Sequence, residues 1–157
     1  MLMQLSWRRT LGVHGAFVVR DDHSRTVLAG AGRIAVVSDA LCAEAHACIE
    51  ALMVAANQGM QHVMVETDSQ ILVKALQTDE FDRAQGGVLF REAKFLMATM
   101  FSSASVVHVH RSCNSVGHEL ARAGRIRDLD HPTVWVHPLP DFVIALLVRE
   151  SAEPLVP

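Results

Sequence analysis

The segment Val63–Leu76 constrains the fold more than any other part of the chain, because two structural patterns follow one another in it. A short β-branched stretch at residues 62–66 predicts a buried strand, and an amphipathic helix is expected from Ser69 to about Leu76. Asp68 lies between the strand and the helix. In open α/β sheets, ligands bind beyond the carboxyl ends of the strands. The segment therefore predicts an α/β fold and makes Asp68 a candidate functional residue.

The remaining segments predict a sheet of mixed strand direction with flanking helices, which is an α/β fold. A polar turn at 20–25, between two apolar runs, indicates a hairpin. Elsewhere, apolar residues at helical spacing predict helices, and a polar loop is expected at 77–87. In chain order we expect strands at 16–19 and 26–31, a helix capped by Ser38 or Asp39 and running to about Asn57, a strand at 62–66, helices at 69–76 and 88–101, a strand at 105–110, a helix at 114–124, and a docking helix or edge strand at 142–148.

Size and composition narrow the class of protein. The chain has 157 residues, half of them hydrophobic, which suits one domain with a substantial core. A net charge of -3 excludes a grossly basic polyanion-binding protein, so contact with nucleic acid would require a local basic patch or metal ions. The cysteines, at 42, 48 and 113, lack paired spacing and are typical of reduced thiols. The longest apolar run, 142–148, is far shorter than the ~20 residues of a membrane helix. We therefore expect an intracellular protein without membrane contact, in either the nucleus or the cytoplasm.

Glu44 is a second candidate carboxylate. Helical spacing places it beside Leu41 and Cys48, at the border of the apolar helix face. A partly buried carboxylate needs a partner, and a metal ion, an arginine or helix N-terminal amides would each serve. Asp68 has a comparable structural alternative, because Thr-Asp-Ser before a helix is also good capping chemistry. Taken singly, each of the two residues leaves a structural role open.

Three blocks of sequence contain these residues: Ala-Glu-Ala-His-Ala-Cys-Ile-Glu-Ala-Leu at 43–52, Val-Glu-Thr-Asp-Ser at 65–69 and Val-His-Arg-Ser-Cys-Asn-Ser-Val-Gly-His-Glu-Leu-Ala at 109–121. In order and spacing they resemble the RNase H-like domains of plant and retrotransposon-derived proteins. Residues 15–22 and the hairpin to 33 look like the second and third strands of that family. The resemblance covers about residues 15–127. It leaves 1–14 as an irregular N-terminus or substitute strand, and 128–157 as a Pro-rich tail with a short docking element.

The resemblance implies a ribonuclease that cleaves the RNA strand of RNA–DNA hybrids by two-metal hydrolysis, with Mg²⁺ (or Mn²⁺) held by four carboxylates. Glu44 matches the family's helix glutamate, and Asp68 matches its aspartate after the fourth strand. Both are therefore expected to be catalytic and to bind metal. The first-strand aspartate has no counterpart, because no Asp or Glu precedes Asp21 and the first strand is either missing or replaced by Met1–Arg9. His118 stands where the family has its last aspartate, as a doubtful catalytic substitute.

The two missing carboxylates affect the expected function. We expect metal binding to be weakened and catalysis to be weak or absent, as in a pseudoenzyme that still binds RNA–DNA hybrid or RNA. Candidate contacts to nucleic acid lie on a polar, basic stripe of the last predicted helix and just before it, and the other interpretation of that stripe is a solvated face. These candidates are Asn114, Arg111, Arg122 and Arg125. The alternative function is a remnant of the fold that acts only in protein interaction.

Two histidines raise a separate hypothesis. His108 and His110 alternate along a predicted strand, as a pair of zinc ligands would. No third ligand lies near them in the sequence, so they are interpreted as surface or packing residues.

Overall fold

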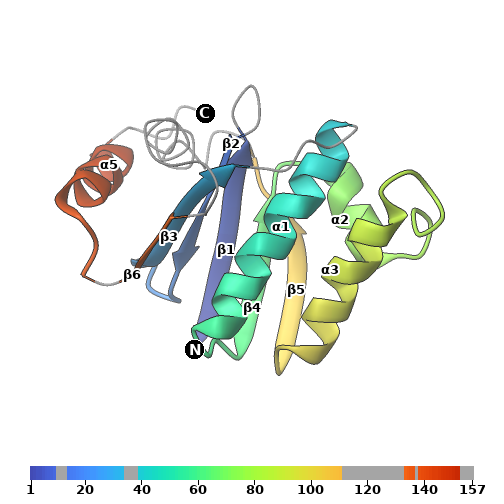
Figure 1. Cartoon of the computed structure of the whole chain (residues 1–157). Helices are drawn as coiled ribbons and strands as arrows, with labels where there is room; N and C mark the ends of the chain where they lie inside the picture. The colour runs from blue at the N-terminus through green and yellow to red at the C-terminus, as the bar shows by residue number, and fades with distance from the viewer. Residues whose placement is uncertain (10–13, 34–38, 111–132, 137, 153–157) are drawn as a thin grey trace.

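The computed structural model describes residues 1–9, 14–33, 39–110, 133–136 and 138–152. Its strands form one six-stranded sheet in the order β5-β4-β1-β2-β3-β6 (Figure 1). Strands β1, β4 and β5 are parallel, whereas β1–β2, β2–β3 and β3–β6 are antiparallel, so the sheet is mixed as expected. The described elements are β1 (Leu2–Arg9), β2 (His14–Arg20), β3 (Thr26–Arg33), α1 (Ala40–Asn57), β4 (His62–Thr67), α2 (Gln70–Gln77), α3 (Gly87–Thr99), β5 (Ser103–His108), β6 (Thr133–Val136) and α5 (Asp141–Ala152).

Strand β1 lies in the middle of the sheet. Leu5 of β1 pairs with Val19 of β2 on one side and with Val65 of β4 on the other, and all three side chains are fully buried. Of the two alternatives left open for the N-terminus, a missing strand and a substitute strand, the structure therefore has a strand. It carries no carboxylate, because Leu2–Arg9 contains neither Asp nor Glu.

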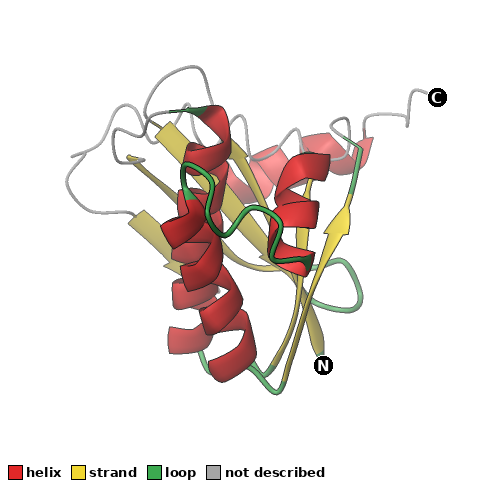
Figure 2. Cartoon of the chain, turned by 90° about the vertical axis from the view of Figure 1, so that its right-hand side faces the viewer, coloured by secondary structure: helices red, strands yellow, loops and turns green. Residues whose placement is uncertain are grey.

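The two faces of the sheet are covered by different helices. Helices α1, α2 and α3 lie together over the face on which Leu5, Phe17 and Val19 point inward, and this side holds the larger core. Val18 points to the opposite face, where it packs with Trp135 of β6 and Val143 of α5 in a smaller cluster. Figure 2 shows the strands from the side as one twisted sheet with helices beside it. The alternation of side chains along β2 thus serves two cores at once.

Helix α1 begins at a side-chain N-cap and packs closely on the fold through small residues. Asp39 is the N-cap and accepts a hydrogen bond from the Cys42 amide at 2.7 Å, which confirms one of the two predicted caps. The helix ends at Asn57 with Gln58 as its C-cap, and the next residue, Gly59, has a φ of 75°, which favours glycine. Its buried residues are largely alanines, which allow a close approach to the sheet and to α3. α1 is long and apolar enough to cross a membrane, but half of it is buried within the fold, as in an ordinary core helix.

Most of the other predicted elements are also present. The hairpin β2–β3, the helices α2 and α3 and the strands β4 and β5 occur within a few residues of their expected positions. At 142–148 the helix alternative is correct, because α5 covers these residues. β6 was not predicted, and it forms an edge strand by pairing with β3. The helix expected at 114–124 lies outside the described residues.

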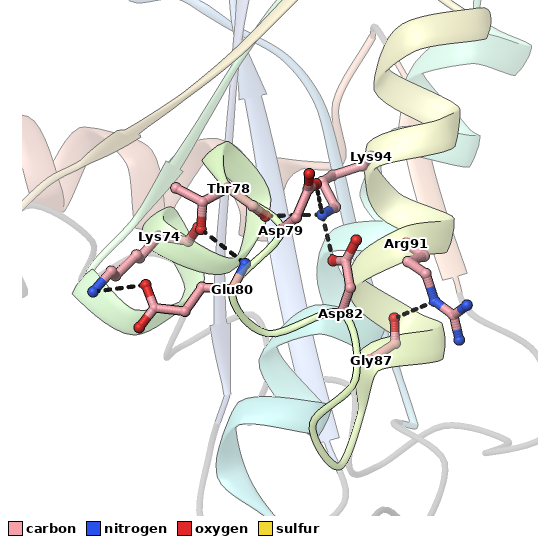
Figure 3. Close-up of polar contacts among 8 residues, drawn as sticks. All are labelled: Lys74, Thr78, Asp79, Glu80, Asp82, Gly87, Arg91 and Lys94. Carbon is pink, nitrogen blue, oxygen red and sulfur yellow. Dashed lines mark hydrogen bonds and ion pairs between the residues drawn. The ribbon is translucent and has the colours of Figure 1, made fainter.

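The polar loop between α2 and α3 is held by a lysine from α3 (Figure 3). Lys94 Nζ donates to the Thr78 carbonyl oxygen at 2.9 Å and to Asp82 Oδ1 at 2.5 Å, and it also reaches Asp79 Oδ1 at 3.4 Å. The loop then closes against the start of α3, where a Cβ at Gly87 would collide with the Asp82 carbonyl oxygen. The loop conformation therefore depends on one cation and on a glycine.

Replacing Lys94 by methionine is expected to lower the free energy of unfolding by about 1–3 kcal/mol, because Asp82 would keep its partly buried charge without this partner. Lys74→Met is the matched control: its ion pair with Glu80 is more than half exposed, so its loss should cost roughly 0.5 kcal/mol or less. Urea unfolding of both variants measures the difference. Equal losses in the two variants would contradict a stabilising role of Lys94 in the loop.

Candidate functional site

A cavity of about 600 Å³ opens at the carboxyl ends of β4 and β5, beside the first turns of α1 and α2. Glu44 from α1 and Asp68 from the β4–α2 junction both line it, so the structure brings together the two carboxylates singled out in the sequence. His108 and His110, from the end of β5, line the same cavity. Helix N-termini favour anions. The cavity thus combines two acidic side chains, two imidazoles and two helix N-termini.

Hydrogen bonds around the β4–α2 junction determine the position of Asp68. Thr67 is buried, its Oγ1 accepts from the Ser69 amide at 3.1 Å, and its carbonyl oxygen accepts from the Val109 amide at 2.9 Å. The N-cap of α2 is Ser69, whose Oγ accepts from the Leu72 amide at 3.1 Å. The capping role considered for Asp68 therefore belongs to Ser69, while the backbone on either side of Asp68 is held in place at the rim of the cavity.

Glu44 lies one turn beyond the start of α1 and is partly buried. The cap of that helix is Asp39, so Glu44 is not needed to cap it. Burial raises the pKa of the Cys48 thiol, and the charge of Glu44 one turn away raises it further. Cys48 is therefore a protonated, unreactive thiol in the core, and it offers neither a thiolate ligand nor a nucleophile to the cavity.

His108 and His110 line the cavity, which their interpretation as surface or packing residues did not predict. Both are exposed, as predicted, but two carboxylates from other elements line the same cavity. His108 Nε2 donates to the Asp68 carbonyl oxygen at 3.2 Å. Their position in the sequence was the available signal, because they lie at the end of a strand parallel to β4, at the edge of the sheet where Asp68 lies.

The neighbouring strand β1 brings no third carboxylate to this edge. The pairing of β1 with β4 ends at Ser6 and Glu66, just before the edge where Asp68 lies. Glu66 lies on the other face of the sheet, because Val65 and Thr67 are the inward residues of β4. Partial burial raises the pKa of the Glu66 carboxyl, although Arg20 partly offsets this. The described parts of β1 and β4 thus add no third carboxylate on the face of the sheet that carries Val65 and Thr67.

A second acidic group lies at the opposite end of the sheet, in the β2–β3 turn. Donor atoms of Asp21, Asp22 and His23 lie within 4.8 Å of one another, and these residues are the one such group among the described residues. Asp21 is buried, which opposes ionisation, but hydrogen bonds from the Arg25 and His23 amides and the Arg25 guanidinium outweigh this and lower its pKa. The group stabilises the turn and, at the opposite end of the sheet, cannot replace a ligand beside Asp68.

The remaining candidates lie outside the described residues. They are Asn114, Arg111, Arg122, Arg125 and the doubtful catalytic residue His118. Their roles stay predictions.

Solved structures that are similar to this chain have the same fold. The chain is similar to RNase H1 from the halophilic archaeon Halobacterium salinarum, with 24% identity over 80% of this chain and 96% of that one, and a TM-score of 0.61. It is also similar to the N-terminal RNase H domain of a Mycobacterium tuberculosis protein (22% identity, 78% and 92% coverage, TM-score 0.62). A third similar structure is LC11-RNase H1 in complex with RNA/DNA hybrid (18% identity, 78% and 94% coverage, TM-score 0.65). No curated protein matches the chain.

The mixed sheet and its flanking helices therefore define an RNase H-like fold. The model of the reverse transcriptase-like family matches residues 6–124, and the chain belongs to that family. The match begins within β1, which is earlier than the start at about residue 15 inferred from the sequence motifs.

Proposed function

We propose that this chain is a nucleic-acid-binding domain that engages RNA–DNA hybrid at the cavity beside Asp68, with weak or no hydrolysis of the RNA strand. The observation that carries this proposal is that Glu44 and Asp68, from separate elements, line one cavity at the carboxyl ends of parallel strands. The N-termini of α1 and α2 at the same edge favour phosphate groups. A relative of the same fold was solved in complex with RNA/DNA hybrid.

The donor set does not suit the family's pair of Mg²⁺ ions. Magnesium prefers oxygen ligands, whereas half of the metal-binding side chains that line the cavity are imidazoles. Strand β1, which pairs with β4, contributes no carboxylate, because Leu2–Arg9 contains neither Asp nor Glu. Two carboxylates supply only half of the negative charge with which the family holds two divalent ions. The proposal is therefore binding of the hybrid through its backbone, with no two-metal step.

Fluorescence anisotropy with a labelled RNA–DNA hybrid tests the binding. We expect saturable binding that weakens as salt rises, because neutralised phosphates release their counterions. Asp68→Asn should bind at least as tightly as the unaltered chain, since the change removes a negative charge from the site. Absence of binding would contradict the proposal.

A cleavage assay with the same hybrid, in Mg²⁺ or Mn²⁺, tests the second half of the proposal. We expect the rates of the unaltered chain and of Asp68→Asn to be equally low. Asp22→Asn is the matched control, since its exposed carboxylate lies in the turn at the other end of the sheet. Cleavage that is lost in Asp68→Asn and kept in Asp22→Asn would show an active nuclease and contradict weak catalysis.

A protein-interaction role is the second candidate function. Val88 and Phe95 lie two turns apart on α3 and are each about two-thirds exposed, at 67% and 65%. Apolar side chains exposed together on one helix face are typical of interaction surfaces. This candidate predicts no hybrid binding in the anisotropy experiment.

A further inference from the structure

The cavity beside Asp68 has a mixed set of metal-binding side chains. Glu44 and Asp68 provide carboxylates, and His108 and His110 provide imidazoles, from three separate parts of the chain. Carboxylates alone favour Mg²⁺, Ca²⁺ or Mn²⁺, whereas imidazoles favour Zn²⁺ and its neighbours in the first transition series. Zinc sites that combine histidines with a carboxylate are common. The ligand types therefore point to a different metal from the one that the family would use.

The hydrogen bond of His108 favours the same conclusion. Its Nε2–H donates to the Asp68 carbonyl oxygen at 3.2 Å. A neutral imidazole that donates from Nε2 keeps its lone pair on Nδ1, where a metal binds. Histidine ligands of metals usually donate their other N–H to a carbonyl or a carboxylate, and this bond orients the ring. His108 thus has the hydrogen bond that a metal-binding histidine requires.

We propose that this cavity binds one Zn²⁺-class transition-metal ion through His108, His110, Asp68 and Glu44. No three of these donor groups lie within 4.8 Å of one another, so binding requires the other three side chains to turn towards His108, whose ring is held by its hydrogen bond to the Asp68 carbonyl oxygen. His110 is exposed, and exposed side chains change rotamer quickly. The buried thiol of Cys48 takes no part, because it stays protonated.

Two alternatives within the described residues are less favourable. The group Asp21–Asp22–His23 already has its donor atoms together, but Asp21 accepts hydrogen bonds from two amides and a guanidinium, and Asp22 pairs with His23 at 2.9 Å. His62 lies at the other end of the sheet from the cavity and hydrogen-bonds Ser103 Oγ at 2.8 Å. Neither group lines the cavity at the carboxyl ends of β4 and β5.

The test is calorimetric titration of the full chain with Zn²⁺ and with Mg²⁺ after EDTA treatment, with Co²⁺ absorption as a spectroscopic probe. We expect one equivalent of Zn²⁺ to bind more tightly than Mg²⁺ by at least about an order of magnitude. The double variant H108A/H110A should weaken Zn²⁺ binding at least about tenfold. His23→Ala is the control and should bind as the unaltered chain does, while circular dichroism checks that both variants fold.

Three results would overturn the inference: no Zn²⁺ binding, equal affinity for Mg²⁺, or unchanged Zn²⁺ affinity in H108A/H110A. Loss of binding in His23→Ala instead would assign the ion to the β2–β3 turn and would also overturn it. The proposed metal site lies in the same cavity as the proposed hybrid-binding site, but the titration contains no nucleic acid. Absence of hybrid binding would therefore not contradict the metal site, and absence of Zn²⁺ binding would not contradict hybrid binding.

Discussion

Phe90→Ala is expected to lower the free energy of unfolding by about 3–5 kcal/mol, the largest single effect that we expect in this chain. Phe90 of α3 is fully buried in the larger core and makes an edge-to-face contact with Phe81, with ring centroids 6.5 Å apart. Alanine would remove this contact and leave a cavity that the surrounding helices can only partly close. Because natural domains are stable by only about 5–15 kcal/mol, a large part of the total would be lost.

Urea unfolding, followed by circular dichroism, measures this loss as a lower transition midpoint. Phe95→Ala is the matched control on the same helix: its side chain is 65% exposed, so its removal should change stability by roughly 0.5 kcal/mol or less. A loss at Phe90 no larger than the loss at Phe95 would show that α3 does not pack on the core as described.

Leu5→Ala should cost about 2–5 kcal/mol, because Leu5 is fully buried between Val19 and Val65 in the middle of the sheet. This prediction tests the N-terminal segment directly. An irregular N-terminus would lose little on truncation of this leucine, whereas a central strand would lose packing against two neighbours and against α1.

The neighbouring residue provides the control for Leu5. Gln4→Ala alters the same strand on its opposite, partly exposed face, and we expect a change below about 1 kcal/mol. The two variants are compared by urea unfolding. Similar small losses at both positions would mean that Met1–Arg9 contributes no strand to the core.

Local chemistry explains which elements were predictable. The β2–β3 hairpin, the Asp39 cap of α1 and the strand–helix unit around Asp68 each depend on residues close together in the sequence. β6 depends on a partner about a hundred residues away, since Thr133–Val136 becomes a strand by pairing with β3 and by burying Trp135 against α5. β1 is similar, because its central position is set by pairing on both sides.

The candidate site shows the same division. The sequence by itself determined the α/β class, the two carboxylates Glu44 and Asp68, and the absence of an acidic residue before Asp21. Only the tertiary structure decided that His108 and His110 share a cavity with those carboxylates, and that Leu2–Arg9 is a central strand of the sheet. The physical reason is that local patterns define elements, whereas a cavity is lined by elements that meet through pairing and packing of distant segments.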